Sequence, residues 1–255
     1  MTDGTVTSPV ATANDEQPGL TQLQRVLYTF TAPTKTFKDI LRNTSWWLPF
    51  LLSVLVSYGF IFAMVSHVGW DKLTENGMKQ NPSAMERMNS MPADQRASTM
   101  EISKKITQGI TYSIPILSLV FAAICALVLW GTMNFLFGGQ ATYKQVLAVW
   151  FYGTLPLIFV GILGVITQLA GVDPDSFNPQ NPVGTNIGYY LSQEAPKWLS
   201  ILMTQFDIIY IWAMVLVGIG SAIVAKTKRN SGLIAVFGWW ALIAIARMGM
   251  AAVQS

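Results

Sequence analysis

Residues 110–137 read ITYSIPILSLVFAAICALVLWGTMNFLF and contain no charged side chain. The hydrocarbon core of a bilayer is about 30 Å thick, so roughly 20 apolar residues in an α-helix cross it. This stretch is therefore long enough to span a membrane. Four further stretches have the same character, and together the five predict an all-α membrane protein with five transmembrane helices. The other four are residues 46–66, 146–170, 199–225 and 232–252.

The composition agrees with one membrane bundle. Of the 255 residues, 52% are hydrophobic and only 11% are charged, whereas about a quarter of the residues are charged in a typical soluble domain. No segment outside the five stretches is long and apolar enough to build a soluble core. Residues 1–19 are polar and lack the features of a signal peptide, so we expect a short disordered tail there, followed by one membrane domain over 20–252.

Few side chains are available for chemistry. The chain has one cysteine, Cys125, and one histidine, His67, whereas zinc sites use several such ligands. No HExxH motif, no Ser/His/Asp set and no carboxylate pair within a span is present. We therefore predict no enzymatic activity and no cofactor. The basic residues are scattered over membrane ends, which favours contact with the lipid bilayer over binding of nucleic acid.

The distribution of Lys and Arg predicts the orientation. Short basic segments near span ends tend to stay in the cytoplasm. The side that holds the N-terminus carries Arg25, Lys35, Lys38, Arg42, Lys144, Lys226, Lys228 and Arg229. The other side carries Lys72, Lys79, Arg87, Arg96, Lys104, Lys105 and Lys197. The totals are similar, but Arg42 and the 226–229 group lie next to spans. We expect a cytoplasmic N-terminus and a C-terminus outside.

Residues 20–43 predict two short helices at the membrane surface. Leu20, Leu23, Leu27 and Phe30 recur at spacings of three and four, which places them on one helix face. Pro33 interrupts the helix. The second helix combines apolar positions with basic flanks, as helices that lie in the interface do. An alternative is that the segment docks on the bundle, and both descriptions can hold together. Two indole side chains then mark the interface as anchors, Trp46 and Trp47.

The two long loops fall on the outer side, where they could cap the bundle. In the 67–109 loop, proline residues favour helix starts, so we expect helices near 82–90 and 92–108, the second running into the next span. The 171–198 loop is rich in Pro, Asn and Gly and should be irregular. Met85, Met88 and Met91 have the spacing of Cu(I)-binding thioethers, although methionine is also a common apolar filler.

Asp207 and Arg247 are the only charged residues inside the five stretches. They lie 21 residues before and 19 residues after the turn near residue 228, so their depths differ by about 3 Å. Because lone charges at membrane depth are costly, we predict that the two form an ion pair or share a polar pocket. The pair could be a structural pin or a transport site, or Arg247 could extend to the surface alone.

Two prolines lie inside predicted spans. Pro115 falls in the 110–137 stretch and Pro156 in the 146–170 stretch. Each removes one backbone hydrogen bond and can kink a helix. Such kinks occur in transporters and also in static bundles.

Several stretches resemble the Yip (Ypt-interacting protein) domain family, particularly its bacterial members. These are residues 32–40 (APTKTFKDI), 46–50 (WWLPF), 139–147 (GQATYKQVL) and 150–156 (WFYGTLP), with Asp207 and Trp212 in the fourth span. The resemblance implies five spans with a cytosolic N-terminus. Eukaryotic relatives bind Rab-type GTPases or shape membranes, but this sequence lacks their Asp-Leu-Tyr-Gly-Pro segment, so Rab binding is not carried over.

These features favour a multi-pass protein of the bacterial inner membrane without catalytic activity. It would organise the membrane or bind a membrane or cytosolic partner protein. The alternative is a transporter of small solutes or ions that uses an Asp207/Arg247 pocket. A water-filled cavity reaching Asp207 would favour transport, and a dry bundle would favour the first hypothesis.

Overall fold

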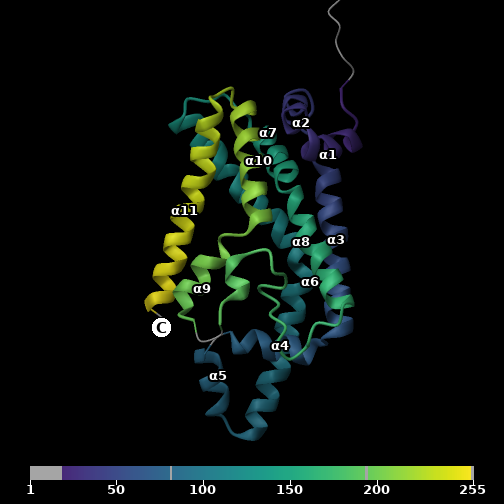
Figure 1. The fold of residues 1–255 in the computed structure, drawn as a ribbon, viewed down its shortest axis with the longest axis vertical. Coiled ribbons are helices and arrows are strands. Elements are labelled where there is room, and N and C mark those ends of the chain that lie inside the picture. The colour runs from purple at the N-terminus through teal and green to yellow at the C-terminus, as the bar shows by residue number, and fades with distance from the viewer. Residues whose placement is uncertain (1–18, 81, 193–194, 254–255) are drawn as a thin grey trace, which may run out of the picture.

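The structure is a computed structural model and describes residues 19–80, 82–192 and 195–253. Within these residues every regular element is a helix, and the only strand-like contact is an isolated bridge between Asn186 and Asp207. Apart from Gly19, the tail expected over residues 1–19 lies outside the described residues. Figure 1 shows an elongated helical bundle with α1 and α2 at one end and α4 and α5 toward the other.

Four helical segments in the described part of the chain are long and apolar enough to cross a membrane. They are α3 (Trp47–His67), α6 (Ala93–Gly131) with η1 (Thr132–Leu136), α7 (Tyr143–Gly153) with η2 (Leu155–Leu157) and α8 (Ile158–Leu169), and α11 (Arg229–Val253). Many of their large apolar side chains face outward; Phe62 is 76% exposed and Leu169 is 79% exposed. Apolar surface of this extent requires an apolar surrounding. The protein is therefore a multi-pass membrane protein.

The expectation of one uninterrupted helix over 199–225 is wrong. The segment forms two helices, α9 (Lys197–Thr204) and α10 (Ile208–Val224), separated by three residues that end with Asp207. Asp207 occupies the N-cap position of α10, where its carboxylate accepts backbone hydrogen bonds. A carboxylate is a strong helix-starting group at this position. With 17 residues, α10 is about 26 Å long, which is shorter than the hydrocarbon core.

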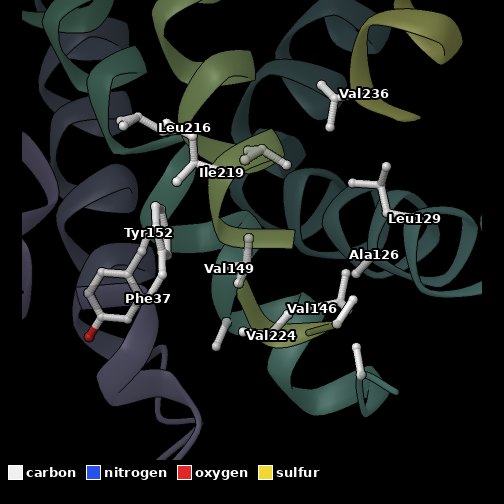
Figure 2. Packing of buried hydrophobic residues seen from close by; sticks show 14 of the residues in the cluster. Phe37, Ala126, Leu129, Val146, Val149, Tyr152, Leu216, Ile219, Val224 and Val236 are labelled. Atoms are coloured by element: carbon white, nitrogen blue, oxygen red, sulfur yellow. The ribbon is translucent and has the colours of Figure 1, made fainter. Parts of the chain in front are cut away.

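Helix α10 lies in the middle of the bundle, and its second half is almost entirely buried. Figure 2 shows Leu216, Ile219 and Val224 of α10 in one cluster with Val149 and Tyr152 of α7. Glycines allow the close approach of its neighbours. A Cβ atom on Gly153 would lie 2.9 Å from the backbone nitrogen of Val217, and one on Gly232 would lie 2.0 Å from the carbonyl oxygen of Gly218. Both contacts require the absence of a side chain.

At the opposite end from α1 and α2, the two long loops pack on each other. The first loop contains α4 (Trp70–Lys79) and α5 (Pro82–Asn89), and the second contains η3 (Ile187–Tyr190). Phe177 enters a small apolar cluster with Met64, Val68 and Leu73. The ring of His67 is 2.8 Å from the carbonyl oxygen of Val172. Asn76 donates hydrogen bonds to the carbonyl oxygens of Pro174 and Phe177.

Candidate functional site

The N-terminal part of the described chain forms a helical hairpin of α1 (Gln22–Thr31) and α2 (Pro33–Ile40). Thr21 begins α1 with a capping box: its hydroxyl accepts from the backbone of Gln24, and the Gln24 side chain accepts from the backbone of Thr21. Pro33 then occupies the first turn of α2, where its missing N–H costs nothing. The break expected at Pro33 is therefore present.

A buried ion pair joins the two helices. The Nε atom of Arg25 donates a 2.6 Å hydrogen bond to the Asp39 carboxylate, and the exposed fractions of the two side chains are 2% and 8%. The guanidinium also donates to the carbonyl oxygen of Asn43 at 2.8 Å. One side chain thus fixes α1, α2 and the segment that leads into α3. We call this arrangement the Arg25 clamp.

The polar groups around the clamp are satisfied. The hydroxyls of Thr29 and Thr36 donate to the carbonyl oxygen of Arg25 at 2.8 and 2.9 Å. The backbone N–H of Leu20 donates to the second Asp39 oxygen at 3.3 Å. Because burial of two charges is costly, such a pair is held only when further hydrogen bonds complete its coordination. The Leu20 N–H and the carbonyl oxygens of Asn43 and Ser45 supply that completion, whereas the two threonines satisfy the backbone carbonyl of Arg25.

The hairpin is docked on the bundle. The hydroxyl of Tyr152 in α7 donates a 2.5 Å hydrogen bond to the side chain of Gln22. Phe37 and Ile40 of α2 are fully buried in the main core cluster. The ring of Phe30 lies 5.6 Å from that of Phe159 in α8 and 5.8 Å from that of Trp212 in α10, measured between centroids. The hairpin is therefore packed against α7, α8 and α10.

Helix α1 buries two polar side chains and exposes two leucines, while its other apolar side chains pack against the bundle. Its polar residues Arg25 and Thr29 face inward, whereas Leu23 and Leu27 are 65% and 59% exposed. In a water-soluble protein, a helix on the surface would turn its polar face outward. The outward face of α1, defined by Leu23 and Leu27, thus matches an apolar environment. Lys35 and Lys38 on α2 are also exposed.

The sequence interpretation did not pair Arg25 with Asp39. It placed Leu20, Leu23, Leu27 and Phe30 on one face of a helix but assigned no role to the opposite face. A signal was present, because Asp39 is the only acidic residue between positions 19 and 70. A basic side chain buried within the hairpin could therefore form an ion pair inside this segment only with Asp39.

Asp207 and Arg247 are not joined by an ion pair in the described residues. One carboxylate oxygen of Asp207 accepts from the backbone N–H groups of Ile209 and Tyr210, both at 2.9 Å. The other accepts from the Thr185 hydroxyl at 2.5 Å. The capping role removes the need for a cationic partner. Arg247 lies in α11, four residues before Ala251.

The two prolines behave differently. Helix α6 continues through Pro115 without interruption, whereas Pro156 lies in the short 3₁₀ segment that separates α7 from α8.

The two tryptophans expected to anchor the chain at the membrane interface also differ from each other. Trp46 stacks on Phe151 with centroids 4.5 Å apart, and Trp47 is 53% exposed. Trp47 therefore has the exposure that an anchor needs.

The three methionines of the outer loop do not share one environment. Met88 is buried, and the sulfur of Met91 accepts a hydrogen bond from Thr99 at 3.7 Å. Copper binding by Met85, Met88 and Met91 stays a prediction. Among the described residues, no group of three or more His, Cys, Asp and Glu side chains could hold a metal ion.

The comparisons with known proteins agree with the resemblance in the sequence. The model of one family, described as the Yip1 domain, matches residues 27–250. The match begins inside α1 and ends inside α11, so it includes most of the docked hairpin and all four long membrane helices. No curated protein and no solved structure matches the chain. The protein belongs to the Yip1 domain family.

Proposed function

We propose that the chain is a membrane protein without catalytic activity that organises the membrane through its N-terminal hairpin. The observation that carries this proposal is the outward leucine face of α1, where Leu23 and Leu27 point away from the bundle. Moving one leucine side chain from water to an apolar environment stabilises by about 1.5–3 kcal/mol. Membership of the Yip1 domain family supports a role at the membrane.

The hairpin would act in one leaflet only. It lies at one end of the bundle (Figure 1), so its leucines would enter the layer between headgroups and acyl chains while Lys35 and Lys38 reach the headgroups. The Arg25 clamp and the Tyr152 contact would hold it rigidly to the spans. A rigid volume added to one leaflet would change local lipid packing around the protein.

The proposed topology has five spans, a cytoplasmic N-terminus and a C-terminus outside. Helix α10 would be the span added to the four long helices, and it is the fourth in chain order. Its limited length is acceptable because neighbouring helices, and not lipid, surround most of its second half. The basic character of the end with the hairpin supports placing that end in the cytoplasm.

Transport is the less favoured function. It required a charged pocket at Asp207 and Arg247, but both oxygens of Asp207 are engaged by the α10 cap and Thr185. The outward face of α1 could contact a partner protein in place of lipid. The fluorescence experiment described next distinguishes these two contacts.

A reporter at position 27 tests the proposal. An environment-sensitive fluorophore is attached to Leu27→Cys in a Cys125→Ala background, and the protein is reconstituted in liposomes without other proteins. We expect quenching by lipid-attached quenchers and protection from a water-soluble quencher. A matched reporter at Lys38→Cys should show the opposite pattern. Equal access of the water-soluble quencher to both positions would refute insertion, and protection of Leu27→Cys in native membranes alone would identify a protein partner instead.

A further inference from the structure

A hollow of about 200 Å³ opens between α2, α10 and the start of α11. The segments that line it, in α2 and around the turn between α10 and α11, lie at the same end of the bundle (Figure 1). Its lining consists of Thr34, Ile219, Ala222, Ile223, Thr227 and Arg229. Pockets for drug-sized ligands usually measure about 300–1,000 Å³, so this hollow suits a group the size of a lipid headgroup.

The lining combines one cation with hydroxyl and apolar groups. Arg229 is exposed and takes part in no ion pair among the described residues. No carboxylate lines the hollow. The hydroxyl oxygen of Thr227 is buried and has no hydrogen-bond partner, and Thr34 supplies a second hydroxyl. A guanidinium and hydroxyl groups are donors that recognise an anion.

The electrostatic potential around the hollow is positive, like the charge of Arg229. The described residues at this end include eight basic side chains and one acidic side chain. The basic ones are Arg25, Lys35, Lys38, Arg42, Lys144, Lys226, Lys228 and Arg229. The acidic one, Asp39, and the buried Arg25 neutralise each other, which leaves seven basic side chains to set the surface potential. An anion that approaches the hollow therefore meets an almost purely positive surface.

Three apolar side chains form one wall of the hollow, and this apolar wall favours an amphiphilic ligand over a soluble ion. Ile219, Ala222 and Ile223 would contact carbon atoms next to the anionic group, whereas inorganic phosphate has no such atoms. Basic pockets between membrane helices recognise the headgroups of anionic lipids. We propose that this hollow binds the phosphate group of an anionic phospholipid, with Arg229 as its cation and with the apolar wall against the glycerol region.

The test compares two neighbouring cations. Full-length protein in nanodiscs is titrated with a fluorescent phosphatidylglycerol and, separately, with phosphatidylcholine that carries the same fluorophore. Arg229→Gln should weaken phosphatidylglycerol binding about tenfold, the equivalent of one charge-assisted hydrogen bond. Lys228→Gln removes the same charge one residue away but does not touch the hollow, so it should weaken binding less than about twofold. Arg229→Lys should recover most of the affinity.

Several outcomes decide the proposal. An equal loss in Arg229→Gln and Lys228→Gln would overturn it, because the surface field alone would then account for binding. Equal binding of both lipids would overturn it too. Displacement of the lipid by millimolar inorganic phosphate would support the anion site but assign it to soluble phosphate. Thermal unfolding of each variant excludes misfolding as the cause. Leu27→Ser should leave lipid binding at the hollow unchanged, so the site and the hairpin function are tested separately.

Discussion

Arg25 donates to Asp39 across the turn at Pro33, and this 2.6 Å contact is the buried charge pair that closes the N-terminal hairpin. Removing one partner would leave the other charge buried without compensation. We expect Arg25→Met to lower the free energy of unfolding by about 3–5 kcal/mol, measured by thermal unfolding in detergent. The hairpin should also become accessible to protease.

The control for this prediction is another arginine near the same carboxylate. Arg42 is exposed and lies 3.9 Å from Asp39, and surface pairs contribute about 0–1 kcal/mol. Arg42→Met should therefore have a small effect. In the double variant Arg25→Met/Asp39→Leu, the loss should be smaller than in Arg25→Met alone, because no unpaired charge remains. Similar losses in Arg25→Met and Arg42→Met would contradict the assignment of the clamp.

Asp207 should behave as a helix cap and not as half of an ion pair. Asparagine is also a good capping residue, so Asp207→Asn should change stability little. Asp207→Ala should cost about 0.5–2 kcal/mol, and Arg247→Gln should be nearly neutral. Thermal unfolding of the three variants in the same detergent checks the pattern. If Asp207→Asn were as harmful as Asp207→Ala, the charge and not the cap would matter.

The contact of α10 with α11 should tolerate no side chain at Gly232. A Cβ atom there would meet backbone atoms of α10, including the Gly218 carbonyl oxygen at 2.0 Å, and backbone cannot give way easily. We expect Gly232→Ala to destabilise by about 1–3 kcal/mol. Gly59 in α3 has open space at its Cβ position, so Gly59→Ala should stabilise by about 0.5–1 kcal/mol through helix propensity. A neutral Gly232→Ala variant would argue against the close crossing.

The salt bridge between Lys72 and Asp175 should make loop docking depend on pH. Lys72 hydrogen-bonds to Asp175, which lowers the pKa of the carboxyl below its ordinary 3.8 and raises the pKa of the amine above its ordinary 10.5. A depressed carboxyl pKa stabilises the fold above pH 3.8, and this stability is lost as pH falls through the folded value. A raised amine pKa stabilises below pH 10.5, and this stability is lost as pH rises through its folded value.

Hydrogen exchange measures this dependence. Protection of residues 171–178, corrected for intrinsic exchange, should be constant near neutral pH and decrease slightly below the folded pKa of Asp175. Asp175→Asn should show the low protection at neutral pH and lose the dependence. The effect should be small, because the side chains of Lys72 and Asp175 are 43% and 66% exposed and Asn76 still anchors the loop. A pH response that survives in Asp175→Asn would assign it to another group.

Hydropathy located most of the fold because it measures the property that the bilayer selects. The stretches at 46–66, 110–137, 146–170 and 232–252 all fall in the long helices. It did not locate the break before α10, because a window average over 199–225 absorbs one aspartate. The capping role of Asp207 depends on local backbone geometry and on Thr185 from a distant loop, which no window average contains.

The hairpin was predictable in outline and not in its contacts. Leucine spacing and Pro33 were enough to place two helices. The direction of the leucine face was not determined, since an amphipathic helix can turn its apolar side toward protein or toward lipid. The buried position of Arg25 decided that question, and its pairing with Asp39 involves a tertiary contact across a turn. Likewise, the hollow beside Arg229 needs α2 and α10, which are about 180 residues apart.

The docking of Phe37 against α10 has a consequence for biosynthesis. A Cβ atom on Gly220 would lie 2.8 Å from the Phe37 ring, so these two residues meet although 183 positions separate them. At a translation rate of about 5–20 residues per second, the first of them waits roughly 10–40 seconds for the second. During that interval the helices against which the hairpin packs are not yet complete. The outward leucines of α1 would allow the nascent hairpin to bind the bilayer surface. The N-terminal hairpin, although it is synthesised first, would thus be the last segment to reach its final position.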